Sequence, residues 1–420
     1  MISSLWPEKA RWLKFLVAFL LLVYAIIESI GSRNDWDIFL AASRALFEGA
    51  DIYVTTYFDG YHYYYSILFA SLLYPFTLMP PVIAKFIWIG LNMLMIGAIL
   101  KRVMKLFDDL GMSIQHRRWI FLLIFLGSFR FLKSNLHLGQ TTILLLFLSL
   151  EALHQDQQKK PVLAGLLLSL AINIKLLPAV IIPYFIYRAR WRSAIFASIM
   201  VVGWLLFPLS WLGVDRTSAL MHSYVELINP AQARHILDVE EPSFHGLSTF
   251  ISTLFSAQAH EPNGAGWKRN IADVSMDTLS SIILYVRLFF ILLTLYFLRT
   301  VPFKSATNDL HRAWELSYLL LVIPLIAPHQ QHYAFLFATP AIAYVSYCLL
   351  SYKGRRIYSL RIAFAFVLVT FNLALWLGVF NTFYNHYKIL TYGALMLVVL
   401  LTVLIPPGEK QKVGTSPTFQ

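Results

Sequence analysis

Two carboxylates stand at the start of a short amphipathic stretch near the N-terminus. Residues 34–49 read Asn-Asp-Trp-Asp-Ile-Phe-Leu-Ala-Ala-Ser-Arg-Ala-Leu-Phe-Glu-Gly. This pattern predicts a helix that Asn34 or Asp35 caps and that Gly49 terminates. A carboxylate beside the membrane can act as a general base that accepts a proton from a hydroxyl, and we expect Asp37 to do so. Asp35 is a second catalytic candidate, although its position suits a helix-capping role equally well.

Tyrosines crowd the segment that follows these acids, at positions 53, 57, 61, 63, 64 and 65. Their rings are large apolar surfaces with a polar tip, which can pack on the faces of a sugar. We therefore expect the reacting hydroxyl to belong to a sugar. Tyr61 and Tyr64 are predicted to bind the substrate.

Lys175 is a candidate for binding an anion, because it interrupts the apolar run 162–187 and stands close to Pro178. A lysine at membrane depth is costly unless it meets water or an anion. The sequence therefore predicts that Lys175 binds the phosphate of a donor. The alternative is a lysine near a helix end that extends its amine to the membrane surface.

A late polar stretch, 327–333, separates two apolar runs and contains His329 and His332. Histidines three residues apart share one face of a helix, so a metal pair is conceivable. The sequence supplies no third ligand nearby, and we expect no metal site. Both histidines are instead predicted to bind the donor phosphate by hydrogen bonds.

Three further polar residues are predicted to contact the substrate: His137 and Gln140 in the turn 135–140, and His245 in the segment 214–276. Ordinary loop polarity at the membrane surface explains the turn equally well.

The elements that position these residues are apolar spans. Of the 420 residues 58% are hydrophobic and 13% are charged, a composition that excludes a water-soluble enzyme. We predict an all-α polytopic membrane protein that forms a single integral membrane domain over residues 1–420. The twelve expected spans are 12–30, 63–79, 82–100, 119–132, 141–153, 162–187, 194–212, 278–298, 314–326, 333–350, 357–380 and 389–405.

Basic residues set the expected orientation. Their excess gives a net charge of +12, gathered in short clusters between spans, which fits the positive-inside bias and contact with membrane lipids, not nucleic acid. We expect the first outer loop, 31–62, to carry the catalytic acid, and 214–276 to form a second large outer loop. The same count places the basic loop 101–118 outside, against the bias. A hairpin within 162–187, broken at Lys175 and Pro178, would remove this conflict if one of the two spans after residue 62 did not cross fully. We prefer the simple count, because outward basic groups could serve a lipid phosphate.

Several short motifs in this order resemble glycosyltransferase family 87. The motifs are Asp37-Ile38-Phe39, Gly49-Ala50-Asp51-Ile52-Tyr53, Gly139-Gln140, Lys175 with Pro178, Arg190-Trp191-Arg192 and 328–332. The resemblance implies a fold of the GT-C superfamily and a polyprenyl-phosphate sugar donor, as in mannosyl and arabinofuranosyl transferases. It also implies a catalytic acid in the first outer loop, which would be Asp37, and no required metal or other cofactor. Similar proteins often carry Asn-Gln-Ser before a glycine where this chain has Glu-Pro-Ser-Phe-His-Gly at 241–246.

We therefore predict an inverting membrane glycosyltransferase. It moves a hexose or pentose from a polyprenyl phosphate to a glycan or glycolipid acceptor, on the outer face of the plasma (inner) membrane. A flippase or transporter of lipid-linked saccharides is the alternative, although no internal repeat supports it.

Overall fold

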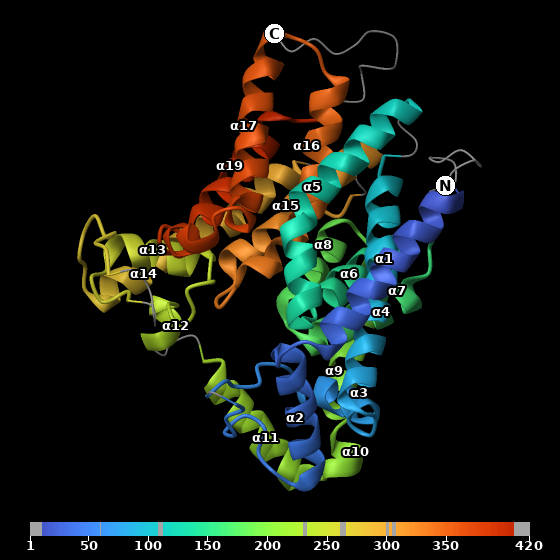
Figure 1. Ribbon diagram of the computed structural model, residues 1–420, viewed down its shortest axis with the longest axis vertical. Helices are drawn as coiled ribbons and strands as arrows, with labels where there is room; N and C mark the ends of the chain where they lie inside the picture. Colours follow the sequence, from blue (N-terminus) through green and yellow to red (C-terminus); the bar gives the residue numbers. More distant parts are fainter. Residues whose placement is uncertain are drawn as a thin grey trace. The chain divides into compact units, whose positions relative to one another are not determined.

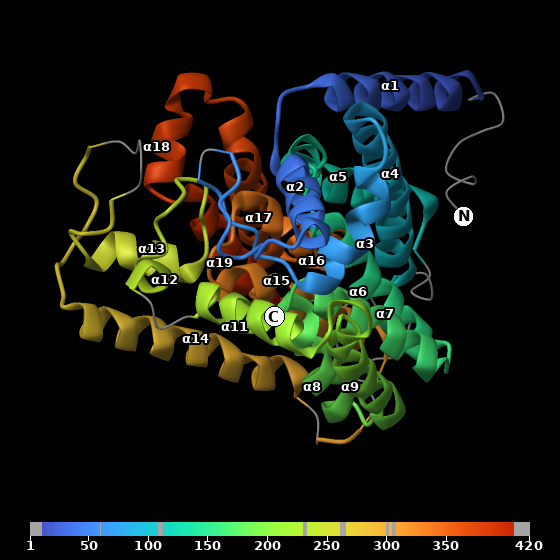
Figure 2. The same cartoon turned by 90° about the horizontal axis from the view of Figure 1, so that it is seen from below.

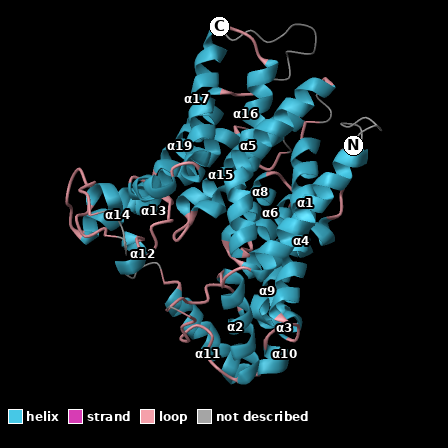
Figure 3. Ribbon diagram, in the orientation of Figure 1, coloured by secondary structure: helices cyan, strands magenta, loops and turns pink. Residues whose placement is uncertain are grey.

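The computed structural model describes residues 11–58, 60–107, 112–229, 233–260, 266–299, 302–304 and 308–406. Within these residues the regular structure is helical (Figure 3), apart from isolated β-bridges such as Tyr57 with Tyr61 and Phe244 with Gln331. The predicted all-α class is confirmed for this part of the chain.

The chain divides into two compact units. Unit 1 comprises residues 1–102 and 133–229, and unit 2 comprises residues 103–132 and 230–420. Two of the three boundaries fall within long helices, α4 (Pro81–Lys105) and α5 (Ile114–Leu138), and the third lies between residues 229 and 230.

Unit 1 contains α1 (Arg11–Ile30), α2 (Asp35–Glu48), α3 (Ile67–Thr77), most of α4, the end of α5, α6 (Thr142–Gln157), α7 (Pro161–Ile174), η4 (Leu177–Val180), α8 (Ile181–Tyr187), α9 (Trp191–Leu206), α10 (Leu209–Leu212) and α11 (Val214–Leu227). Helices α6, α7 and α9 pack together as a core. Gly165 of α7 allows the close approach, because a Cβ there would lie 2.7 Å from the backbone nitrogen of Ala197 in α9.

Helix α2 forms as the sequence predicts. Asn34 is the N-cap, and its side chain accepts a hydrogen bond from Trp36 N–H; Gly49 is the C-cap at φ 99°, in the left-handed region. The apolar side chains of this amphipathic stretch, Ile38, Phe39, Ala42 and Leu46, are buried. Ser43 donates to the carbonyl of Ala70 in α3 at 2.7 Å. Figures 1 and 2 both show α2 and α3 side by side.

The apolar run 162–187 is broken in the middle. Helix α7 ends at Ile174, Lys175 is extended at φ −152° and ψ 134°, and η4 and α8 follow. A proline at the start of η4 cannot continue the hydrogen-bond ladder of α7. The break therefore leaves Lys175 at a helix end and not inside a continuous helix.

Unit 2 contains most of α5 and α12 (Ala233–Leu237), α13 (Leu247–Phe255), α14 (Met276–Leu298), α15 (Asp309–Ile326), η5 (His332–Ala338), α16 (Thr339–Ser351), α17 (Arg355–Asn372), η6 (Leu373–Leu375), η7 (Gly378–Phe380), α18 (Asn381–His386) and α19 (Ile389–Val403). Helices α15, α16, α17 and α19 form its core, gathered together in Figure 1. Ser317 of α15 donates to the carbonyl of Pro340 in α16 at 3.0 Å.

Six described helical segments are long and apolar enough to cross a membrane, and a seventh is reached if α1 and α2, bent by 57°, count as one broken span. The protein is therefore a multi-pass membrane protein. The expected count of twelve spans included three regions, 63–79, 162–187 and 389–405, where the structure has shorter apolar helices. The expected turn 135–140 is also partly helical, since α5 continues to Leu138.

Candidate active site

Asp35 and Asp37 stand on the first turn of α2 and have different partners. Asp37 Oδ2 accepts a hydrogen bond from the backbone N–H of Asn34 at 2.9 Å, which completes a capping box. Asp35 Oδ2 instead accepts a hydrogen bond from the side-chain amide of Gln140. The carboxylate of Asp37 thus stabilises the helix start, and that of Asp35 faces another segment of unit 1.

Gln140 connects Asp35 to a buried tyrosine. Its amide nitrogen donates to Asp35, and its amide oxygen accepts a hydrogen bond from Tyr65 Oη at 3.1 Å. Thr141 Oγ1 donates to the same tyrosine oxygen at 3.3 Å. Gln140 is 2% exposed, so these bonds satisfy an amide that is otherwise costly to bury. The chain Asp35–Gln140–Tyr65 is the core of the site.

Lys175 belongs to the same cluster. Its Nζ lies 5.5 Å from the centroid of the Tyr65 ring, within the range of a cation–π contact, and its charge acts on Asp35. The extended backbone at the end of α7 projects this lysine toward the tyrosine. The structure therefore brings together three of the predicted residues, Asp35, Gln140 and Lys175.

The environment of Asp35 makes its carboxylate a stronger base than an ordinary aspartate. Asp35 lies outside the six long apolar helices. Burial raises its pKa from 3.8 to about 6, while the hydrogen bond from Gln140 and the charge of Lys175 act in the opposite direction. A carboxylate with this pKa is ionised at neutral pH and accepts a proton more readily than a solvated one.

Gly139 fixes the position of this cluster against α2. Its φ is +68°, and a Cβ added there would lie 2.6 Å from the Cβ of Trp36. Trp36 also stacks on Trp88, with ring centroids 4.7 Å apart, and Trp88 Nε1 donates to the carbonyl of Gly139 at 2.9 Å. Only glycine combines this backbone conformation with so close an approach.

The remaining predicted residues of unit 1 have contacts of their own. His137 pairs with Glu28 of α1 at 2.8 Å, and its side chain is 58% exposed. Tyr61 is 48% exposed and pairs through its backbone with Tyr57. The ring of half-buried Tyr64 lies 6.3 Å from that of His62.

Sequence reasoning missed Lys85 near the start of α4. It is 5% exposed, its Nζ donates to the carbonyl of Ser32 at 3.2 Å, and the charges of Asp37 and Glu28 act on its ammonium group. A lone lysine at the start of an apolar run was the available signal.

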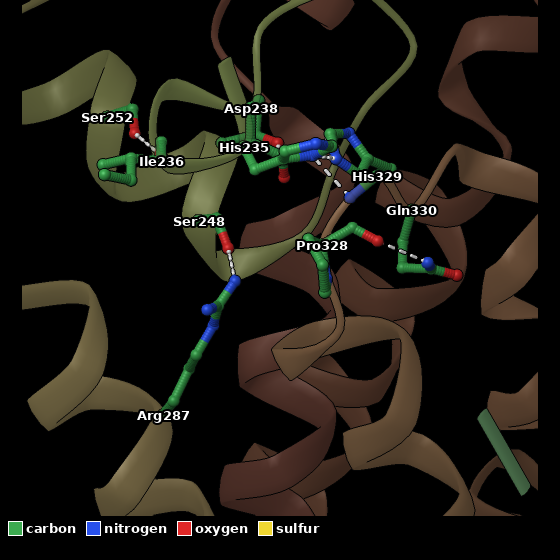
Figure 4. Close-up of polar contacts among 10 residues, drawn as sticks. His235, Ile236, Asp238, Ser248, Ser252, Arg287, Pro328, His329 and Gln330 are labelled. Carbon is green, nitrogen blue, oxygen red and sulfur yellow. Dashed lines mark hydrogen bonds and ion pairs between the residues drawn. The ribbon is translucent and has the colours of Figure 1, made fainter. Parts of the chain in front are cut away.

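In unit 2, His329 contacts a buried aspartate that sequence reasoning also missed. The Nδ1 atom of His329 lies 2.9 Å from Asp238 Oδ1, and its backbone N–H donates to the same oxygen at 2.9 Å. His329 Nε2 contacts Nδ1 of His235. Figure 4 shows the two rings beside Asp238, with Gln330 bonded back to Pro328.

The expectation that His329 and His332 share one helix face is wrong. Residues 327–331 are not helical, His329 has φ 55°, and η5 begins at His332. The backbone N–H of His332 donates to the carbonyl of Ser243 at 3.2 Å.

His245 is fully buried in unit 2. Its Nε2 lies 3.3 Å from Asn385 Oδ1. Burial lowers its pKa well below the usual range, and the charges of Lys388 and Arg130 act in the same direction. His245 is therefore a neutral hydrogen-bonding group at physiological pH.

Comparison with known proteins identifies the family. A search of curated proteins gives no match. Residues 63–351 match the model of glycosyltransferase family 87, a segment that begins after Asp35 and Asp37 and includes Gln140, Lys175, His245, His329 and His332. The match covers well over half of the chain, so the protein belongs to glycosyltransferase family 87 and is a membrane glycosyltransferase.

Proposed function

We propose that the protein transfers a hexose or pentose, of the mannose or arabinofuranose type, from a polyprenyl phosphate to the hydroxyl of a glycan or glycolipid acceptor. The reaction takes place on the outer face of the plasma membrane and inverts the anomeric configuration. The observation that carries this proposal is the cluster of unit 1, where a carboxylate of raised pKa and a lysine flank one buried tyrosine.

Asp35 is the base of this reaction. Both acids of α2 were candidates, but the carboxylate of Asp37 accepts a hydrogen bond from the backbone at the helix N-terminus, whereas Asp35 faces Gln140 and Lys175. Asp35 is partly exposed, so an acceptor hydroxyl can approach it. It removes the proton as the hydroxyl oxygen attacks the anomeric carbon.

Lys175 binds the donor phosphate. When the bond between the anomeric carbon and the phosphate oxygen breaks, that oxygen takes the electron pair and its negative charge increases. A lysine ammonium near this oxygen stabilises the charge as it develops. Attack from the side opposite the phosphate produces the inversion.

The other predicted contacts remain part of this proposal. His329 and His332 are assigned to the donor phosphate, and Tyr61, Tyr64, Gln140, His137 and His245 to the sugar and the acceptor. Gln140 has a second role, because its hydrogen bond orients the carboxylate of Asp35.

The experiment uses purified protein in vesicles with radiolabelled polyprenyl-phosphate mannose and polyprenyl-phosphate arabinofuranose. We expect the label to move to a glycan or glycolipid acceptor with release of polyprenyl phosphate. Asp35→Asn should slow this transfer by on the order of 100- to 10,000-fold. Movement of intact donor between the leaflets, with no bond exchanged, would instead identify a flippase.

Lys175→Met tests the binding of the donor phosphate independently of the proton transfer to Asp35. We expect it to weaken donor binding by roughly tenfold or more, because a charge-assisted contact is lost. Lys133→Met is the matched control, since Lys133 is an exposed lysine of the same unit. Equal donor affinity in the two variants would show that Lys175 does not bind the donor phosphate.

A further inference from the structure

A cavity of about 110 Å³ lies in unit 2, among the turn that follows α13, the segment 266–270 and the end of α18. Lys268 and Arg269 line it together with two histidines, His260 and His386, and none of its described lining residues is a carboxylate. A concave site surrounded by cationic and imidazole groups favours an anion. One water molecule takes about 30 Å³ of liquid, so the cavity has room for a group of roughly the size of a phosphate.

Hydrogen bonds within unit 2 hold the walls of this cavity. The guanidinium of Arg269 donates from Nη1 to the carbonyl of His386 at 2.7 Å and from Nη2 to the carbonyl of Ala259 at 2.6 Å. The backbone N–H of Ile271 donates to the carbonyl of Leu254 in α13 at 2.8 Å. Arg269 therefore joins all three segments, and its charge is fixed at the cavity.

Trp267 and Lys268 belong to the exposed part of the lining. Trp267 is 56% exposed, and its ring lies edge-to-face with that of His386, with the centroids 5.9 Å apart. Lys268 is exposed, so its flexible side chain can bring the ammonium group to a ligand in the cavity. A ligand that enters here meets two cationic groups and one indole ring.

The cavity is close to the start of a long apolar helix. Asn270 lines the cavity, and Met276, six residues later, begins α14 at a distance of at most about 20 Å. Helix α14 is long and apolar enough to cross a membrane, and it packs beside α13 (Figures 1 and 2). Along α14, Leu284, Phe289 and Leu292 are more than half exposed. In a bilayer such side chains contact acyl chains, and lipid phosphates lie at the boundary where the helix begins.

Two acids follow the cavity in sequence, Asp273 and Asp277, and neither lines it. Asp273 Oδ1 accepts a hydrogen bond from the backbone N–H of Ala257 at 2.9 Å, and Asp277 lies in the first turn of α14. A tryptophan and a lysine at a membrane boundary can also be simple anchors that need no specific ligand. The fixed guanidinium beside them, and the cavity that all three side chains line, favour a binding site instead.

We propose that this cavity binds the phosphate of an anionic glycerophospholipid whose acyl chains lie along α14. Arg269 and Lys268 contact the phosphate oxygens, and the indole of Trp267 packs on the glycerol carbons. The cationic lining favours a lipid with a net negative headgroup over a lipid whose headgroup carries a compensating cation. This lipid site is additional to the proposed transferase function and does not depend on it.

The test is native mass spectrometry of the full-length protein in non-ionic detergent, titrated with phosphatidylglycerol or with phosphatidylcholine. We expect phosphatidylglycerol to bind at least about fivefold more tightly, because Arg269 and Lys268 repel the choline cation. Lys268→Gln should lower the affinity for phosphatidylglycerol by about fivefold, the effect of one lysine near an anionic headgroup. Lys353→Gln is the matched control, because Lys353 is an exposed lysine of unit 2 that does not line the cavity. It should change this affinity by less than about twofold.

Ala257→Trp tests the cavity without a change of charge. Ala257 lines the cavity and is exposed, so the larger ring can occupy the space that the phosphate needs. We expect this variant to lose at least about fivefold in affinity for phosphatidylglycerol. Both variants retain Arg269 and its hydrogen bonds to the walls.

Unchanged affinity for phosphatidylglycerol in folded Lys268→Gln or in folded Ala257→Trp would overturn the site. Calorimetric binding of glycerol phosphate, without a preference for phosphatidylglycerol over phosphatidylcholine, would identify a site for a free phosphate ester and overturn the lipid assignment. All of these measurements are made without turnover, so a failure of the proposed sugar transfer would leave their outcome unchanged.

Discussion

Asp35 in unit 1 and Asp238 in unit 2 are both carboxylates held by neighbouring side chains, but they differ in exposure. Asp35 is partly exposed, accepts a hydrogen bond from Gln140 and is near Lys175. Asp238 is fully buried and contacts an imidazole. In the proposed function a substrate hydroxyl reaches Asp35, whereas no part of Asp238 is exposed. The difference in exposure supports Asp35 as the proposed base.

The same contrast recurs within the first turn of α2. Asp35 and Asp37 are two residues apart, about 200° around the helix, so they project from different sides. One carboxylate contacts the helix N-terminus and the other contacts Gln140. Residue type alone does not distinguish the two acids, and our proposal that Asp35 is the base rests on the partner of each carboxylate.

The largest expected effect is the loss of transfer in Asp35→Asn, by on the order of 100- to 10,000-fold, because the amide cannot accept the acceptor's proton. Asp37→Asn is the matched variant and should reduce the initial rate of transfer by less than about tenfold, because the carboxylate of Asp37 caps the N-terminus of α2. Both rates are measured at saturating donor with equal amounts of folded protein. A greater loss in Asp37→Asn than in Asp35→Asn would reverse the assignment.

The second effect concerns the scaffold that holds Asp35. Gly139→Ala should lower the free energy of unfolding of the protein by about 2 kcal/mol, because its Cβ would meet Trp36 at a backbone conformation that alanine disfavours. The measurement is thermal unfolding in detergent. Gly90→Ala is the control: a Cβ at Gly90 in α4 meets no atom within 4 Å, so this change should be neutral or stabilising. Equal melting temperatures for the two variants would contradict the close packing at Gly139.

The fold of α2 was predictable from the sequence, because its signals are local. Asn34, Gly49 and the apolar spacing between them lie within one segment, and they fixed the start, the end and the buried face. The break after α7 was partly predictable, since Lys175 and Pro178 interrupt an apolar run. Both features depend on neighbours a few residues apart.

The site was less predictable, because its contacts are distant in sequence. Gln140 is 105 residues from Asp35, and Asp238 is 91 residues from His329. Periodicity carries no information about such pairs. The spacing of His329 and His332 was misleading because it assumed a helix, whereas the left-handed backbone of His329 breaks the helical phase.

The third prediction follows from the pKa of Asp35. Because burial raises this pKa to about 6, kcat/KM should fall about tenfold for each pH unit below 6 and level off above it. Gln140→Leu removes a hydrogen bond that lowers the pKa, so the acidic limb should move to higher pH. The measurement is kcat/KM between about pH 4.5 and about pH 8, a range that includes the expected transition. An identical profile in Gln140→Leu would mean that Asp35 does not set the limb.

The smallest expected effect tests the cap that distinguishes Asp37 from Asp35. Asn34→Ala removes the side chain that accepts from Trp36 N–H, and should lower the free energy of unfolding by about 1 kcal/mol. Asn34→Asp keeps an acceptor and should retain most of this stability. Asp37→Asn should cost a similar amount or less, because it weakens the other half of the same capping box. If Asp35→Asn destabilises the protein as much as Asn34→Ala while Asp37→Asn leaves the melting temperature unchanged, then Asp35 is the capping carboxylate and the comparison between the two acids is reversed.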